Sequence, residues 1–385
     1  MPFLLEFGLI NITLFLAGYL GKVLRLPSVI FYILIGLFLG KVVHEDETIE
    51  RFSELGIVLL FFYLGLEFNI ARATSTARRI WVVGLLDVFF NFFLILLALK
   101  IIGFSWLISL LGGAVAYASS SAITTKAIAD NRRIANPETE MILGLMVFED
   151  IVAPLLLAVL AGVMAGGELT PTLFGIIALK VIAVFSFVYL IIMIFRERLS
   201  NFIDKFINED LFILFAFGGL IVFAGLTQFI GLSEAIGAFL MGMIISETGK
   251  SHEVEKSMFS IKELAVAIFF FLFGANIVID RSMLEFKFLL TLFIIVVLSI
   301  LGKFLTGYFG GLYYGLSKRT SITAGFSIIN RGEFSIVISK ISPTNFLPLF
   351  GSYILIMSIV GILFAQYAPK LSKFIIKPQK APNLD

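Results

Sequence analysis

Long apolar segments recur along the whole chain, and a short polar or charged stretch interrupts each of them. The apolar runs are about 16–28 residues long, and a helix needs roughly 20 apolar residues to cross a bilayer. Of the 385 residues, 59% are hydrophobic and 15% are charged, whereas about 25% of a soluble chain is charged. A single soluble core cannot bury that much apolar surface, because cores stop growing near about 250–300 residues. These features exclude a water-soluble enzyme and a disordered or fibrous chain, and they predict an all-helical integral membrane protein.

The runs predict 13 membrane-spanning helices, and the Lys and Arg residues between them indicate their orientation. The expected spans are residues 3–21, 27–43, 55–70, 80–102, 106–129, 141–165, 171–195, 211–230, 232–247, 261–279, 286–314, 320–341 and 347–369. With the N-terminus outside, 20 of the 29 Lys and Arg residues fall on the inner side and 6 on the outer side. Cytoplasmic loops carry such an excess of positive charge. We therefore expect the N-terminus outside and the C-terminus in the cytoplasm.

Two segments of the chain repeat each other without a gap. Residues 54–65 read ELGIVLLFFYLG, and residues 263–274 read ELAVAIFFFLFG. These segments belong to the third and tenth expected spans, so seven spans separate equivalent points and the two copies have opposite orientations. We predict two inverted six-helix repeats, joined by a linker helix at about residues 171–200. Secondary transporters commonly have this architecture, with the binding site between the halves. The alternative is chance similarity between two spans rich in Phe and Leu.

A pair of carboxylates lies near the middle of the sixth expected span. An ionisable group in lipid is costly, and it usually faces a cavity or a partner. The adjacent side chains of Glu149 and Asp150 gain from a cation or a proton between them, and oxygen ligands suit hard cations. Neighbouring residues on a helix point about 100° apart, so one carboxylate faces a cavity while the other faces a neighbouring helix. We predict that Asp150 and Glu149 bind a monovalent cation and protons.

A lysine lies deep in the eleventh expected span. Lys303 is roughly 14 residues from the nearest loop, or about 20 Å along a helix, which is too far for its ammonium group to reach the interface. A buried lysine requires a carboxylate partner, and Glu149 and Asp150 are the two candidates. Asp87 lies closer to an end of the fourth span, and we expect it at the membrane interface.

The fifth and twelfth expected spans each contain a polar stretch of small residues at mid-depth. Transporter helices unwind at such stretches and expose backbone ends to a cavity. The candidate site-lining or structural residues are Ser119, Ser120, Ser121 and Thr124 in the fifth span, and Asn330, Arg331 and Glu333 in the twelfth. Arg331 and Glu333 either pair with each other or compensate the partial charges of broken helix ends. The alternative for the Ser and Thr residues is hydrogen bonding between helices.

The sequence does not contain the residues that several classes of function require. The chain has no cysteine and two histidines, which excludes disulfides and thiolate zinc sites and argues against a multi-histidine metal site. It has no basic run with interleaved aromatic residues, so we expect no nucleic-acid partner. The carbonyl filter motif of potassium channels is absent. A solute symporter on a related fold, which would need a larger amphipathic cavity, stays open. We expect no enzymatic activity and no cofactor.

Six motifs together resemble the monovalent cation:proton antiporter superfamily, specifically its second family, which includes Kef-type potassium effluxers and sodium/proton antiporters. They are residues 54–67, 119–123, 148–151, 232–242, 269–274 and 331–335, and the resemblance covers about residues 5–370. It implies a secondary active antiporter that exchanges Na⁺ or Li⁺ for H⁺, with K⁺/H⁺ exchange as the alternative. It also implies a homodimer in the bilayer of a prokaryotic plasma membrane.

The resemblance further implies how the chain is divided. A dimer domain covers about residues 1–79 and 208–280, and a moving core domain covers about 80–166 and 286–373, in which the fifth and twelfth spans cross as unwound segments beside the ion site. Residues 374–385 form a short cytoplasmic tail. Kef-type members usually carry a cytoplasmic nucleotide-binding domain, so we expect either an unregulated antiporter or one whose regulatory domain is a separate chain or has been removed.

The resemblance also assigns roles at the site. Asp150 is similar to the essential carrier of the cation and the proton. Glu149 takes a position where the family commonly has Asp, Asn or Gln, and Lys303 matches the lysine that pairs with an acid at that position in electrogenic members.

Overall fold

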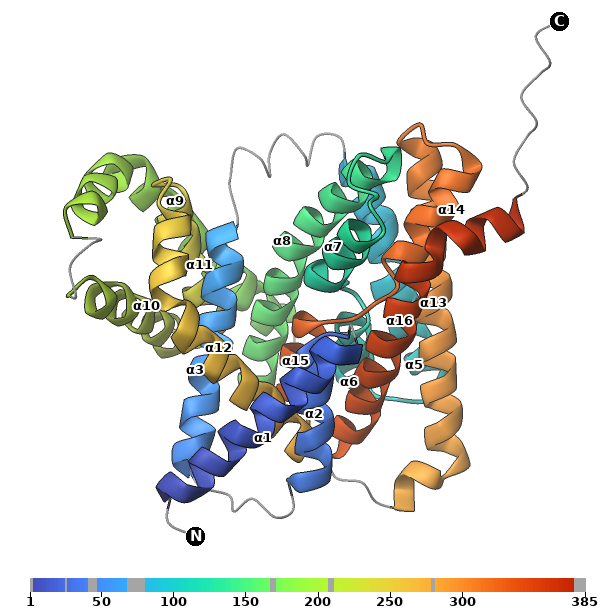
Figure 1. Cartoon of the computed structure of the whole chain (residues 1–385), viewed down its shortest axis with the longest axis horizontal. Coiled ribbons are helices and arrows are strands. Elements are labelled where there is room, and N and C mark those ends of the chain that lie inside the picture. The colour runs from blue at the N-terminus through green and yellow to red at the C-terminus, as the bar shows by residue number, and fades with distance from the viewer. Residues whose placement is uncertain are drawn as a thin grey trace, which may run out of the picture. The chain divides into compact units, whose positions relative to one another are not determined.

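The computed structural model describes residues 3–24, 26–40, 47–67, 80–166, 171–206, 211–277 and 281–376, and it contains no β-strand within them (Figure 1). The all-helical class is therefore confirmed for this part of the chain. Arg72, Arg78 and Arg79, which contribute to the predicted orientation, and tail residues 377–385 lie outside the described residues.

The α-helices follow the order of the expected spans. They are α1 (Phe3–Leu24), α2 (Ser28–Leu39), α3 (Glu47–Glu67), α5 (Leu94–Ile102), α6 (Trp106–Val115), α7 (Ser121–Asp130), α8 (Pro137–Gly166), α9 (Pro171–Phe206), α10 (Leu211–Phe229), α11 (Glu234–Ser246), α12 (Ser251–Ala275), α13 (Phe286–Tyr313), α14 (Lys318–Ser327), α15 (Glu333–Lys340) and α16 (Leu347–Ile375). A π-helical turn, Val88–Phe93, precedes α5, and short 3₁₀ turns, Arg281–Leu284 and Thr344–Phe346, precede α13 and α16.

Eight described helices are long and apolar enough to cross a membrane. They are Leu4–Leu24, Ile80–Ile102, Pro137–Met164, Gly175–Lys205, Phe212–Phe229, Ser251–Ala275, Phe286–Tyr313 and Thr344–Ile375. The other five expected spans correspond to helices of three kinds. Helices α2 and α11 are short, at 12 and 13 residues, and α3 has several charged residues. The fifth and twelfth spans are interrupted, between α6 and α7 and between α14 and α15.

The chain forms two compact units. The first comprises Met1–Thr74, Asp150–Ile279 and Lys340–Pro348, and the second comprises Ser75–Glu149, Asp280–Ser339 and Leu349–Asp385. Helix α8 passes from the second unit into the first between Glu149 and Asp150.

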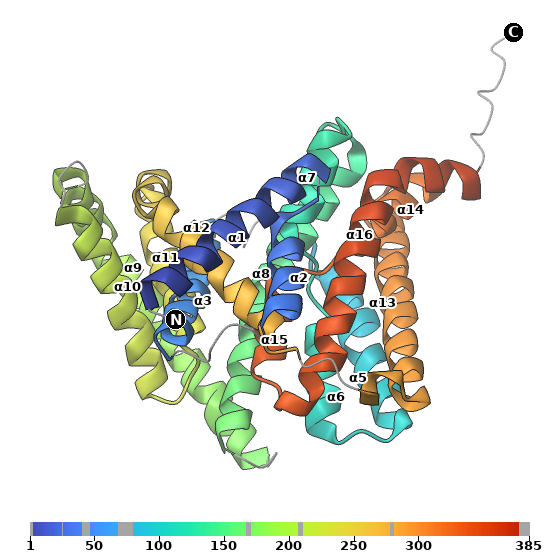
Figure 2. The same ribbon diagram turned by 60° about the horizontal axis from the view of Figure 1, so that its bottom comes forward.

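Within the first unit, α3 packs along α11, and α12 packs along α2, as the two views of the ribbon show (Figure 2). Glycines make both contacts close. A Cβ atom on Gly65 would overlap the carbonyl oxygen of Phe239, and one on Gly274 would overlap that of Ile33. Membrane helices use such small residues because their backbones can then approach and gain van der Waals contact.

Within the second unit, α13 packs against α14, α5 and the π-helical turn. The turn directly follows Asp87, and π-turns inside helices are frequent at functional sites. A Cβ atom on Gly302 would overlap the carbonyl oxygen of Phe90, so the backbones approach closely here. This approach brings Lys303, the next residue of α13, to the buried face of the fourth span.

We predict that Gly65→Ala lowers the melting temperature of the detergent-solubilised protein. The added methyl group has no space against α11, and overpacking of this kind typically costs about 1–3 kcal/mol. Gly218→Ala in α10 is the matched control, because its Cβ atom would meet nothing within 4 Å. Equal melting temperatures for the two variants would contradict the packing argument.

Candidate functional site

A cluster of three buried charged side chains lies within the second unit. The Lys303 ammonium nitrogen is 2.9 and 3.0 Å from the two carboxylate oxygens of Asp87, and 2.8 Å from Oε1 of Glu149. The side chains of Lys303 and Asp87 are 0% exposed, and that of Glu149 is 1% exposed. The fourth span, α8 and α13 each contribute one member, so the cluster joins three helices that are distant in sequence.

Neutral polar groups surround this cluster. Asn91 lies on the π-helical turn, and its Nδ2 donates to Oδ1 of Asp87 at 2.8 Å and to Oγ1 of Thr306 at 3.2 Å. The Lys303 nitrogen also lies 5.6 Å from the ring centroid of buried Tyr117, a distance at which a cation is attracted to an aromatic face.

The interruption between α6 and α7 contacts the cluster directly. The backbone N–H of Ser119 donates to Oε2 of Glu149. The Ser119 hydroxyl lies 3.2 Å from Oε1 of Glu149 and 2.9 Å from the carbonyl oxygen of Ile328. Unwinding at Ser119 therefore frees a backbone donor for the buried carboxylate, as the small polar residues of this stretch predict.

The two interruptions also bind each other. The Ser120 backbone N–H donates to Oδ1 of Asn330 at 2.9 Å, and Nδ2 of Asn330 donates to Oγ1 of Thr124 at 2.8 Å. The Ser120 hydroxyl lies 3.4 Å from a carboxylate oxygen of Glu333. Residues about 200 positions apart thus satisfy each other's backbone groups, as lipid-excluded irregular segments require.

Arg331 stabilises the second interruption from within. Its guanidinium donates to the carbonyl oxygens of Ile329 and Asn330 at 3.0 and 3.1 Å, and to the Tyr353 hydroxyl at 3.0 Å. The side chain is 0% exposed. A cation that binds carbonyls just after α14 compensates the negative end of that helix, which is one of the two roles expected for Arg331.

The remaining expected residues lie at the edges of this arrangement. Asp150 follows Glu149 on α8, and its side chain is partly exposed. Ser121 is the first residue of α7 and is also partly exposed. Glu149, one of the two partners expected for Lys303, is the one whose ion pair with Lys303 the structure describes.

The environment of Asp87 differs from that of an exposed interfacial residue. Although Asp87 lies near one end of the fourth span, its side chain is 0% exposed and forms an ion pair with Lys303. The close approach of α13 at Gly302 overrides its position along the span. Asn91 was missed as well, although an Asp and an Asn four residues apart on an apolar helix lie on one face and signal a buried polar contact.

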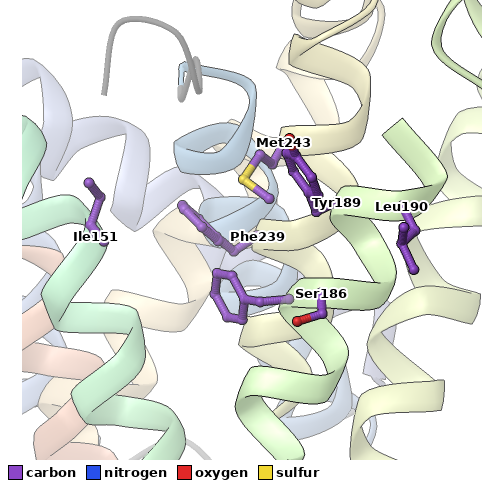
Figure 3. A pocket seen from close by; sticks show the side chains of 7 residues that line it. Ile151, Ser186, Tyr189, Leu190, Phe239 and Met243 are labelled. Carbon is purple, nitrogen blue, oxygen red and sulfur yellow. The ribbon is translucent and has the colours of Figure 1, made fainter. Parts of the chain in front are cut away.

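The first unit contains an apolar cavity of about 520 Å³. Figure 3 shows Ile151 of α8 on one side of it, and Ser186, Tyr189 and Leu190 of α9 on the other. Phe185, Phe239 and Met243 complete the lining. Two hydroxyls offer few oxygen ligands to a hard cation, so the chemistry of ion binding points to the polar groups around α8 and the two interruptions instead.

Comparison with known proteins gives a family match and two similar relatives. A family model described as the transmembrane part of the sodium/hydrogen exchanger matches residues 11–375. The ammonium/H⁺ antiporter subunit AmhT of Alkalihalophilus pseudofirmus is 37% identical over 381 residues, which cover 99% of this chain and 97% of that protein. The K⁺/H⁺ antiporter subunit KhtU of Bacillus subtilis is 32% identical over 391 residues, with coverage of 97% and 95%.

A solved structure shares the fold. The sodium proton antiporter MjNhaP1 of Methanocaldococcus jannaschii superposes with a TM-score of 0.63, covering 97% of this chain and 99% of that one, at 18% sequence identity. At this identity the likeness shows a common fold alone.

We predict that Lys303→Met strongly destabilises the protein. The substitution leaves two buried carboxylates without their cation, and breaking a buried ion pair in this way costs about 3–5 kcal/mol. Lys318→Met, at an exposed position, is the control. If both variants melt together at pH 8, the cluster does not stabilise the fold.

Proposed function

The chain belongs to the sodium/hydrogen exchanger family, and from this premise we propose that it is a secondary active antiporter that exchanges a monovalent cation for protons. The observation that carries the proposal is the buried contact between Glu149 and Lys303, one residue from Asp150 and hydrogen-bonded to the interruption at Ser119. Charged side chains within membrane-spanning helices are costly, and they usually mark ion or proton pathways.

Competition at Asp150 is the proposed coupling mechanism. Its carboxylate binds either a proton or a dehydrated cation, and because both ligands need the same oxygens, they cannot occupy it together. Alternating access follows when the core domain slides and exposes the site to the other side of the membrane. Moving the empty, ionised site through lipid is penalised, so the domain crosses only when a ligand is bound. The partly exposed Asp150 side chain beside fully buried Glu149 supports this division of roles.

The proposed cation is K⁺ or ammonium, with Na⁺ or Li⁺ as the alternative. The named relatives at 37% and 32% identity are an ammonium/H⁺ and a K⁺/H⁺ antiporter subunit. These two cations are similar in size, so one cavity can accept both. The structural neighbour is a sodium proton antiporter, but its 18% identity supports the fold only.

The proposed architecture is an inverted repeat with 13 spans, N-terminus outside, in the plasma membrane of a prokaryote. Its support is a contact that occurs twice in the first unit. In the segments that match in sequence, Gly65 and Phe62 of α3 correspond to Gly274 and Phe271 of α12. A Cβ on Gly242 of α11 would overlap the carbonyl oxygen of Phe62, and a Cβ on Gly36 of α2 would overlap that of Phe271. The pairs α3–α11 and α12–α2 are thus related as two copies of one motif.

The proposed assembly is a homodimer, with residues of about 1–79 and 208–280 forming the dimer domain and about 80–166 and 286–373 the moving core. Both relatives are named as subunits. Their names support a regulatory partner that is a separate chain.

We predict that Asp150→Asn abolishes cation-driven proton movement in proteoliposomes that contain a pH-sensitive dye. The amide cannot carry the exchangeable proton, although the protein should elute as a folded species. Addition of K⁺, ammonium, Na⁺ and Li⁺ in turn identifies the cation. Glu140→Gln is the control, because this carboxylate is exposed and accepts a hydrogen bond from the Tyr314 hydroxyl at 2.9 Å, away from the proposed site.

The same assay separates the rival functions. Full exchange by the Asp150→Asn variant would reject the site. Solute uptake without proton counterflow would indicate a symporter, and cation flux that an imposed pH gradient cannot reverse would indicate a channel.

A further inference from the structure

We propose that Arg133 is a positioning residue for transport, which holds the end of α14 through Ser327 and thereby sets the geometry of the second interruption. This inference rests on the proposed function and adds a residue to its machinery. Arg133 forms an ion pair with Glu138 inside the second unit, with Nη2 3.0 Å from Oε1, and both side chains are only 4% exposed. A buried ion pair at the turn between α7 and α8 needs a reason of its own.

The turn between α7 and α8 closes without the Arg133 side chain. The backbone N–H of Arg133 donates to the carbonyl oxygen of Ile128, and that of Arg132 donates to the carbonyl oxygen of Ala129, each at 2.9 Å. With Arg132 in the left-handed region at a φ of 55°, this is the Schellman motif that ends many helices. The residue at the position of Arg133 in that motif frequently makes an apolar contact. Helix termination therefore does not explain a buried guanidinium here.

The guanidinium instead reaches α14. Nε and Nη2 of Arg133 donate to Oε1 of Glu138 at 3.2 and 3.0 Å, and Nη2 also donates to the hydroxyl oxygen of Ser327 at 2.9 Å. The Ser327 hydroxyl gives its own hydrogen to the carbonyl oxygen of Thr323 at 2.7 Å, so towards Arg133 it is an acceptor. Ser327 is the last residue of α14 and lies 194 positions from Arg133 along the chain.

Ser327 is the residue at which α14 meets the second interruption. Its carbonyl oxygen lies 3.3 Å from the Thr124 hydroxyl of α7 and 3.3 Å from Nδ2 of Asn330. Asn330 in turn accepts a hydrogen bond from the backbone N–H of Ser120 in the first interruption. Ser327 is therefore bonded to Arg133 through its side chain, and through its carbonyl group to the residues that join the two interruptions.

The ion pair contributes direction more than stability. A buried ion pair adds little stability over apolar residues of the same size. Nη1 of Arg133 is buried and has no hydrogen-bond partner among the described residues, and an unsatisfied buried donor costs free energy. A planar guanidinium that a carboxylate holds on one edge presents its remaining N–H groups in a fixed direction. Arg133 thus fixes Ser327 relative to the carboxylate of Glu138.

The anchor of this arrangement is the helix that carries the proposed site. Glu138 lies in the first turn of α8, and Glu149 lies further along the same helix. The Glu138 carboxylate is itself held, because Nδ2 of Asn136 donates to its Oε1 at 3.2 Å. Arg133 therefore ties the start of α8 to the end of α14. Loss of this tie allows Asn330 and the first interruption to shift relative to α8, which weakens cation binding while the protein stays folded.

The test measures exchange in proteoliposomes with a pH-sensitive dye, over a concentration series of the cation that the wild type exchanges among K⁺, ammonium, Na⁺ and Li⁺. Arg133→Met and Ser327→Ala should each raise the half-saturating concentration roughly tenfold, because each removes a hydrogen bond to a charged group. The double variant should be no worse than either single variant, because both remove the same interaction. Arg132→Met is the control, because this neighbouring arginine is exposed, and it should keep the wild-type value.

The outcomes separate positioning from a purely structural role. A structural role lowers the melting temperature and the maximal rate and leaves the half-saturating concentration unchanged. An unchanged half-saturating concentration in Arg133→Met or in Ser327→Ala, or a double variant whose effect is the product of the two fold-changes, overturns the inference and leaves the antiporter assignment intact. No cation-driven flux in the wild type overturns both. If Arg133→Met yields no monodisperse protein, Ser327→Ala decides the question.

Discussion

One ammonium group held between two carboxylates is the interaction on which the rest of this structure depends. Lys303 and its partners come from three helices, and a buried charge of this kind requires a partner of opposite charge. The close packing of α13 on the fourth span brings Lys303 to Asp87. The interruption at Ser119 supplies Glu149 with a backbone donor. The arrangement of the three charges therefore depends both on helix packing and on the unwound segment.

Much of the architecture could be predicted from the sequence because lipid imposes simple rules. The length of apolar runs predicts spans, and the chain is indeed all-helical where it is described. The polar stretches of the fifth and twelfth spans predicted breaks in those helices, and the structure has interruptions between α6 and α7 and between α14 and α15. The pairing of Lys303 with one carboxylate of α8 followed from burial alone. All of these inferences use properties of single segments, which a sequence displays directly.

The burial of Asp87 could not be predicted by the same reasoning, because the exposure of a side chain depends on neighbouring helices as well as on its distance from the end of its own helix. An aspartate near a helix end looks interfacial until another helix covers it. Here Gly302 allows α13 to pack over Asp87, and the sequence does not indicate which backbone a glycine in an apolar span will approach. The hydrogen bonds between Asn330 and residues of the other interruption were beyond reach for the same reason, because they join positions more than 200 residues apart.

The π-helical turn at Val88–Phe93 has a consequence for how such a site can change. A π-turn holds roughly one residue more than an α-helical turn, so it shifts the helix phase by about 100° between the residues before it and those after it. Loss of a single residue there would restore a regular helix and rotate Asp87 relative to the buried face of α5. The number of charges at the centre of this protein is therefore set by helix phase as well as by residue type.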